Sequence, residues 1–92
     1  MRRMNAVELA EYLKKSPALL VDVREPWEFD ICHIAGSCNI PMAQIQAQIA
    51  RLRSAQETVV ICHHGVRSLQ VIQYLQPMGI DNLINLDGGV DA

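Results

Sequence analysis

The sequence predicts a single α/β domain with a parallel sheet that is covered by helices on both faces. Three aliphatic runs, at residues 19–23, 58–61 and 83–86, are unbroken rather than alternating, as expected of strands buried on both faces. Segments with helical spacing separate these runs, and parallel strands need crossovers of that kind. The 92 residues suffice for one domain, near the small end of what folds without disulfide or metal support.

The elements of the first half can be placed from capping and spacing signals. Asn5 and Glu8 have the spacing of a capping box, which predicts a helix that runs to about Lys15. After the first strand, a proline at a first helical position predicts a short helix over 25–29. We expect another short strand over 37–40, which a proline ends.

Two longer helices are predicted in the second half. One follows the strand at 58–61, begins around residues 66–68 and ends at 77–79, where a proline and a glycine stand. The other precedes that strand, because apolar residues recur there at spacings of three and four: Met42, Ile45, Ile49 and Leu52.

Composition and charge exclude several classes of protein. Half of the residues are apolar and 4% are aromatic, which predicts an aliphatic core. The net charge of −2 does not suit a nucleic-acid-binding surface, so we expect no nucleic-acid partner. No apolar run approaches the ~18 residues of a membrane span, and no signal segment opens the chain. We therefore expect a cytoplasmic protein with reduced thiols at its three cysteines, Cys32, Cys38 and Cys62.

Cys62 lies where a buried strand ends and a short loop leads into a helix. Ligand sites of open α/β sheets gather at the carboxyl ends of strands. The loop contains Gly65, which can adopt unusual backbone angles, and Arg67, which adds a positive charge. Backbone N–H groups at the start of a helix stabilise a thiolate. This arrangement predicts a nucleophilic sulfur at Cys62.

The length of the loop separates two possible reactions. Protein tyrosine phosphatases place five residues between their cysteine and their arginine. Here Ser68 occupies that arginine position and Arg67 comes one residue earlier. A smaller ring of backbone amides suits a sulfur atom better than a phosphoryl group, so the spacing favours sulfur chemistry.

Three segments resemble the signatures of rhodanese-like domains. The segment 20–41, which includes His33-Ile34-Ala35-Gly36-Ser37, resembles their first signature region. Residues 60–68 are similar to their active-site loop, and 79–89, which ends in Leu86-Asp87-Gly88-Gly89, is similar to their closing region. The resemblance implies one rhodanese-like domain over residues 1–92, with a central parallel sheet of about five strands flanked by helices on both faces.

The resemblance implies a thiosulfate sulfurtransferase. The Cys62 thiolate attacks the outer sulfur of thiosulfate or another persulfide donor, and a thiophilic acceptor then takes that sulfur from a Cys62 persulfide. No metal and no organic cofactor are implied, because the cysteine itself carries the sulfur. The implied acceptor is a thiol such as thioredoxin, glutathione or a sulfur-carrier protein.

The resemblance also assigns roles to individual residues. Cys62 is the expected catalytic residue, and Arg67 is expected to attract the anionic donor. Backbone N–H groups of the loop stabilise the persulfide as an oxyanion hole does. Structural support is expected from an ion pair of Asp22 with Arg24 and from His33. The expected substrate-binding set is His63, His64, Gly65, Val66, Arg67 and Ser68.

Two positions depart from the family pattern. Cys32 stands where a glycine is usual, so a positive φ would strain it, although we expect the structure to tolerate it. A second thiol there is the alternative. The chain also stops at Ala92, where a tryptophan and a closing helix normally follow, so we expect an incomplete last helix.

Three other functions stay open at this point. They are a non-catalytic rhodanese module for binding or regulation, a phosphatase or arsenate-reductase-like enzyme, and a metal site. The spacing of Cys32 and Cys38 is too wide for a typical zinc site. The candidate metal ligands are Cys32, His33, Cys38, Cys62, His63 and His64.

Overall fold

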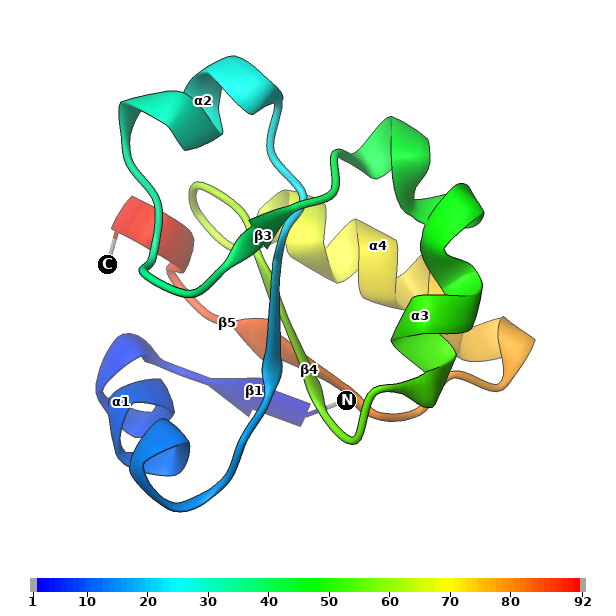
Figure 1. Ribbon diagram of the computed structural model, residues 1–92, viewed down its shortest axis with the longest axis horizontal. Coiled ribbons are helices and arrows are strands. Elements are labelled where there is room, and N and C mark those ends of the chain that lie inside the picture. Colours follow the sequence, from blue (N-terminus) through cyan, green and yellow to red (C-terminus); the bar gives the residue numbers. More distant parts are fainter. Residues whose placement is uncertain (1, 92) are drawn as a thin grey trace.

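The computed structural model describes residues 2–91, which form five strands in a single parallel sheet (Figure 1). The strand order is β1-β5-β4-β2-β3, and each neighbouring pair is parallel. The predicted parallel sheet of about five strands is therefore confirmed, while residues 1 and 92 of the predicted domain lie outside the described part. The strands are β1 (Arg2–Met4), β2 (Leu19–Asp22), β3 (Cys38–Asn39), β4 (Thr58–Ile61) and β5 (Leu83–Leu86).

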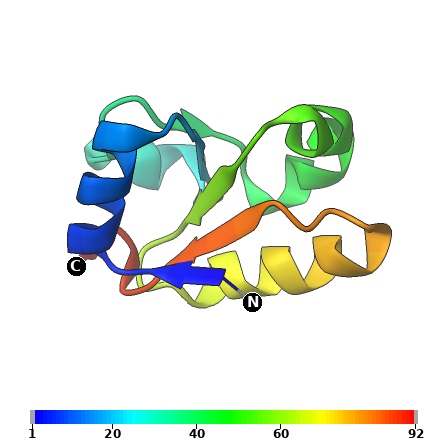
Figure 2. The same cartoon turned by 90° about the horizontal axis from the view of Figure 1, so that it is seen from below.

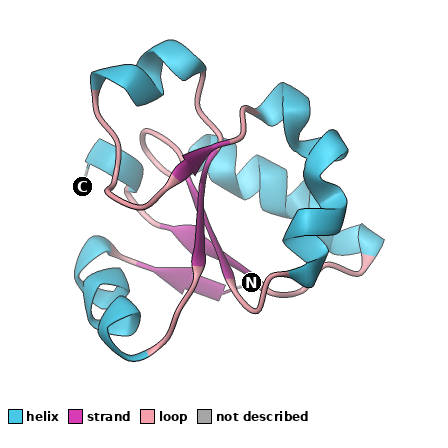
Figure 3. Cartoon of the chain, viewed as in Figure 1, coloured by secondary structure: helices cyan, strands magenta, loops and turns pink. Residues whose placement is uncertain are grey.

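Helices connect the strands, and Figure 3 shows the alternation of the two kinds of element. Within residues 2–91, none of the helices is long and apolar enough to span a membrane. The α-helices are α1 (Ala6–Lys15), α2 (Pro26–Ile31), α3 (Ile49–Ser54) and α4 (Val66–Leu75). Residues 2–91 also contain three 3₁₀ segments: η1 (Met42–Gln48), η2 (Gln76–Met78) and η3 (Gly89–Asp91).

The capping box predicted for α1 is confirmed. The Asn5 side chain accepts a hydrogen bond from the Glu8 N–H at 2.8 Å, and the Glu8 carboxylate accepts one from the Asn5 N–H at 2.9 Å. These two bonds satisfy backbone donors that the first helical turn leaves without partners. The helix therefore begins where the sequence predicted.

The segment from Met42 to Ser54 differs from the single helix that its spacing predicted. It forms the 3₁₀ segment η1 and then the short helix α3, and Gln48, the last residue of η1 and the N-cap of α3, departs from α-helical geometry, with φ −111° and ψ 13°. A spacing of three residues fits a 3₁₀ turn as well as an α-helix. Ile45 and Leu52 are buried and Ile49 is partly buried, but Met42 is exposed, so the predicted apolar face is confirmed only in part.

The sheet separates two aliphatic cores. One contains Val60 of the central strand and Cys62, which follows that strand, and lies under η1, α3 and α4. The other contains Val59 and Ile61 and lies under α1. Figure 2 shows α1 and α4 on opposite sides of the sheet. Successive residues of a strand point to opposite faces, so the position of Cys62 after β4 directs its side chain toward the face of α4.

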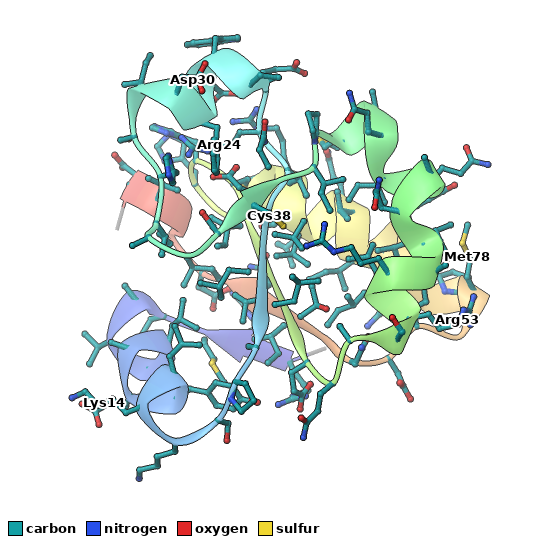
Figure 4. All side chains as sticks on the ribbon, in the orientation of Figure 1. Lys14, Arg24, Asp30, Cys38, Arg53 and Met78 are labelled. Carbon is teal, nitrogen blue, oxygen red and sulfur yellow. The ribbon has the colours of Figure 1, made fainter. Side chains whose placement is uncertain are left out.

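Helix α2 is attached to the rest of the domain by polar contacts. None of its six residues, all of which the structure describes, is buried. The Arg67 guanidinium donates two hydrogen bonds to the two carboxylate oxygens of Glu28, at 2.7 and 2.8 Å. Arg24, which lies below α2 in Figure 4, donates to the Cys32 carbonyl at 2.7 Å. Charged side chains thus take the place of an apolar seam.

The ion pair changes the titration of Glu28. The hydrogen bonds from Arg67 outweigh the opposing effect of burial, and the Glu25 N–H adds a further bond, so the pKa of Glu28 falls from 4.5 to about 2. A carboxyl group whose pKa is lower in the folded protein stabilises the fold above its unfolded pKa. That contribution is lost as the pH falls from about 4.5 toward 2.

We predict that Glu28→Gln lowers the free energy of unfolding by about 1 kcal/mol at pH 7, because Arg67 is one-third exposed and solvent screens the pair. Urea denaturation between pH 7 and pH 3 measures the difference from the unsubstituted protein. The difference shrinks once the pH falls below 4.5. Glu11→Gln, which breaks the exposed Glu11–Lys14 pair, is the control and leaves stability nearly unchanged. A pH-independent loss in Glu28→Gln would contradict the assignment.

Candidate active site

Cys62 lies immediately after β4, the strand that pairs with both β2 and β5. Its side chain is 1% exposed and belongs to the core on the α4 face. The loop that follows turns back over the sulfur and enters α4 at Val66. The predicted position of Cys62, between a buried strand and a helix, is therefore the observed one.

The loop closes around the sulfur atom. The Gly65 N–H donates a hydrogen bond to Cys62 Sγ at 3.0 Å. Gly65 is the N-cap of α4 and has φ +97°, a left-handed conformation that favours glycine. A Cβ atom at this position would also lie 3.2 Å from Gly88 N and 3.3 Å from Leu86 O. Glycine is therefore required at 65 by both conformation and space.

A second segment holds the loop from behind. The Val90 N–H donates to the Cys62 carbonyl at 2.8 Å, and the Asp91 N–H donates to the His63 carbonyl at 3.0 Å. Gly89, with φ +61°, lets the two segments approach, because a Cβ atom there would collide with those carbonyl groups. The Gly88-Gly89 pair is recognisable in the sequence only as a signature, and its contact with the loop appears in the folded structure.

The environment of the sulfur favours its ionised form. Burial raises the pKa of the Cys62 thiol, since a charge is poorly solvated there. Hydrogen bonds from the backbone N–H groups of Ser68, Gly65 and His64 lower it. The donors outweigh burial, and the pKa of Cys62 lies below its ordinary value. Such a thiol can act as a nucleophile near neutral pH.

Ser68 and Asn85 form a polar pair beside the sulfur. Ser68 Oγ lies 3.4 Å from Cys62 Sγ and donates a hydrogen bond to Asn85 Oδ1. Both side chains are buried. Ser68 belongs to the predicted loop, whereas Asn85 was not among the predicted site residues. The signal that could have selected it is a polar residue inside the apolar run of β5.

Arg67 does not leave a free positive charge at the loop. Its two terminal nitrogen atoms both donate to the Glu28 carboxylate, which raises the pKa of Arg67 and offsets its positive charge. The expected role in attracting an anionic donor therefore stays a prediction. The structure adds a partner, Glu28, that the sequence analysis did not select.

A pocket of about 340 Å³ opens beside the loop. Its walls come from α2 and from the loop. Of the expected substrate-binding residues, His63, His64 and Arg67 line the pocket, whereas Gly65, Val66 and Ser68 are not among its lining residues. Trp27 and Ile31 are 65% and 74% exposed and form the apolar part of its rim. The lining includes Trp27, Glu28, Ile31, Cys32, His63, His64 and Arg67.

The two histidines lie close to an acidic residue of η3. His64 Nδ1 is 3.5 Å from Asp91 Oδ2, and His63 Nε2 is 3.9 Å from Asp91 Oδ1. Potential metal-ligand atoms of these three residues lie within 4.8 Å of one another. This group differs from the six candidate ligands taken from the sequence, of which it contains only the two histidines.

The remaining positions lie around α2. Cys32 has φ −162°, which is extended backbone that any residue adopts, so the strain considered for this position does not arise. Asp22 and Arg24 form the expected ion pair, at 2.7 Å, with both side chains buried. His33 Nδ1 lies 2.8 Å from the Phe29 carbonyl, and its ring stacks on the Phe29 ring. Asp22 and Arg24 thus support the end of β2, and His33 the end of α2.

Comparison with known proteins agrees with the resemblance seen in the sequence. The model of the rhodanese-like domain matches residues 5–92. The thiosulfate sulfurtransferase GlpE of Pseudomonas fluorescens is 34% identical over 84 residues, which are 91% of this chain and 77% of that protein. The uncharacterised protein YqhL of Bacillus subtilis is 39% identical over 72 residues, which are 78% of this chain and 57% of that protein.

A solved structure has the same architecture. The crystal structure of a rhodanese-like domain protein from Staphylococcus aureus matches with a TM-score of 0.90 and 33% identity, over 100% of this chain and 90% of that one. The family match covers nearly the whole described chain, including β4, the Cys62 loop and α4. The chain therefore belongs to the rhodanese-like family.

Proposed function

We propose that this chain is a sulfurtransferase that carries a sulfane sulfur on Cys62, from thiosulfate or another persulfide donor to a thiol acceptor. The main support for this proposal is the hydrogen bond from the Gly65 N–H to Cys62 Sγ at the start of α4. Hydrogen-bond donors there lower the pKa of the thiol. Its relative GlpE bears the name thiosulfate sulfurtransferase, which supports the same substrate class.

The proposed reaction has two displacement steps. The Cys62 thiolate attacks the outer sulfur of thiosulfate, an S–S bond forms to Cys62, and the bond to the sulfite sulfur breaks as sulfite leaves with its electron pair. In the second step an acceptor thiolate attacks the outer sulfur of the persulfide. Cys62 then leaves as a thiolate, so the enzyme returns to its starting form without a redox cofactor.

Backbone groups supply the positive potential for both steps. The loop directs N–H groups toward the sulfur, and the N-terminus of the ten-residue helix α4 adds a partial positive charge. The same groups stabilise the negative charge on the outer sulfur of a persulfide. Arg67 contributes less than a free arginine because Glu28 holds it.

Phosphate-ester hydrolysis is a weaker candidate. Ser68 occupies the position that holds arginine in phosphatase loops, and its hydroxyl lies against the sulfur instead of extending toward a substrate. The ring of amides is therefore one residue shorter than a phosphate cradle. Activity toward phosphate esters that depends on Cys62 would reverse this order.

The acceptor is proposed from the reaction that it must perform. It presents a thiol to the pocket between α2 and the loop, whose rim contains Trp27 and Ile31. Thioredoxin, glutathione and a sulfur-carrier protein all meet this requirement. Incubation of the persulfurated protein with each thiol, followed by mass spectrometry of both partners, identifies the acceptor that removes the sulfur.

We predict that Cys62→Ser abolishes sulfur transfer from thiosulfate to cyanide, because the nucleophile is lost while the side chain keeps its size. Mass spectrometry after incubation with thiosulfate shows one added sulfur atom on the unsubstituted protein and none on the variant. Cys32→Ser and Cys38→Ser are the controls and retain the addition. Sulfur loading in Cys62→Ser, with its circular dichroism unchanged, would refute the proposed function.

We predict opposite effects for the two members of the Arg67–Glu28 pair. Arg67→Ala raises the KM for thiosulfate, and Glu28→Gln lowers it by roughly three- to tenfold, because the guanidinium is then free to attract the anion. Steady-state kinetics with thiosulfate and with a neutral alkyl persulfide measures both effects. The neutral donor is the control and shows little change. Equal changes for both donors would assign the pair to structure alone.

A further inference from the structure

A network of hydrogen-bonded polar side chains leads from the surface to the active-site sulfur. The Arg3 guanidinium donates to the Asp87 carboxylate at 2.9 and 3.1 Å. Asp87 Oδ1 in turn accepts a hydrogen bond from Asn85 Nδ2 at 2.8 Å. Asn85 Oδ1 accepts one from the Ser68 hydroxyl, whose oxygen lies 3.4 Å from Cys62 Sγ. This network joins residues of β1, β5, the turn after β5 and α4.

The donor and the acceptor of each hydrogen bond in this network are fixed. A carboxylate only accepts hydrogen bonds, so Asp87 requires the amide nitrogen of Asn85 to face it. The amide oxygen then faces Ser68, and only the single hydroxyl hydrogen of Ser68 can bind it. That hydrogen cannot also be donated to Cys62. Toward the sulfur, Ser68 presents a lone pair.

We propose that Asn85 is a positioning residue for Cys62, which holds the hydroxyl hydrogen of Ser68 so that this hydroxyl accepts a hydrogen bond from the thiol. All three side chains are at least 98% buried, so water does not compete for these bonds. The side of the sulfur next to Ser68 therefore favours the thiol. The side next to the Gly65 N–H favours the thiolate.

The opposite effects of Ser68 and of the Gly65 N–H on the ionisation of Cys62 matter for the reaction. In this step the inference rests on the proposed function. A thiolate loses nucleophilicity as its pKa falls, and the best attacking thiol has a pKa near the ambient pH. Asn85 prevents the donors of the loop from acidifying Cys62 further. In the persulfide the charge lies on the outer sulfur, and the neutral inner sulfur needs no donor from Ser68. The pair thus favours the loaded protein over the free thiolate.

Other charged groups lie around the Cys62 loop, and the test leaves them in place. Arg67 of α4 interacts with the charge of Cys62, and Glu28 of α2 offsets that arginine. His63 and His64 lie close to Asp91 beside the loop. Asp22 and Arg24 form an ion pair at the end of β2. The groups around the loop are Asp22, Arg24, Glu28, His63, His64, Arg67 and Asp91.

The test is the titration of Cys62 followed by the ultraviolet absorbance of its thiolate, with the Cys62→Ser protein subtracted. Asn85→Leu removes the acceptor while keeping the size of the side chain. The Ser68 hydroxyl is then free to donate to the thiolate, so the acid-dissociation constant of Cys62 rises about tenfold, which is one pKa unit. In a Ser68→Ala background the same substitution changes nothing.

Two further variants keep the test decisive if Asn85→Leu folds poorly. Asp87→Ala, at a partly exposed position, lets the Asn85 amide rotate and donate to Ser68. It lowers the pKa of Cys62 more when Ser68 is present than in the Ser68→Ala background, because any direct charge effect is common to both. Asn82→Leu is the matched control, since Asn82 binds the Leu52 and Ala55 carbonyls instead, and it leaves the titration unchanged.

The outcomes separate this inference from the proposed function. An unchanged titration in Asn85→Leu, or an equal shift with and without Ser68, would overturn the role of Asn85. An equal shift in Asn82→Leu would do the same. The titration needs no sulfur donor, so a protein that fails to accept sulfur from thiosulfate but shows the predicted shifts would refute sulfur transfer and support Asn85.

Discussion

The pairing of β4 with strands on both sides fixes the position of the active-site loop. Asp22 of β2 is in register with Ile61, and Asn85 of β5 is in register with Val60. The ends of both neighbouring strands are therefore level with the start of the loop. A shift of one residue in either pairing would turn Cys62 toward the α1 face, because side chains alternate along a strand. The loop contacts described above depend on this register.

The two arginines beside the site are each paired with a carboxylate. Arg67 is neutralised by Glu28, and Arg24 by Asp22. The positive potential at the sulfur comes instead from backbone N–H groups and from the start of α4. Buried dipoles are screened by salt much less than exposed charges are. The stabilisation of anionic sulfur at Cys62 is consequently a property of the fold rather than of the surface.

Local patterns predicted most of the fold and the core of the site, because the features concerned lie close together in the sequence. The strand at 58–61 and its loop were found from an apolar run and a glycine. Strand Arg2–Met4 was missed, since an edge strand with exposed side chains carries no apolar signal. The partners Glu28 and Asn85 were missed for another reason. Their contacts with α4 join residues 39 and 17 positions apart, and only the folded sheet brings them together.

The hydrogen bonds from η3 to the loop can form only late in the synthesis of the protein. Cys62 and His63 leave the ribosome well before residues 88–91, whose backbone must bind their carbonyl groups. Strand β5, which borders β4, also comes later in the chain. Until those residues are added, the loop lacks the hydrogen bonds that Val90 and Asp91 donate to it. The frame of the active-site loop is therefore complete only after residues 88–91 have folded against Cys62 and His63.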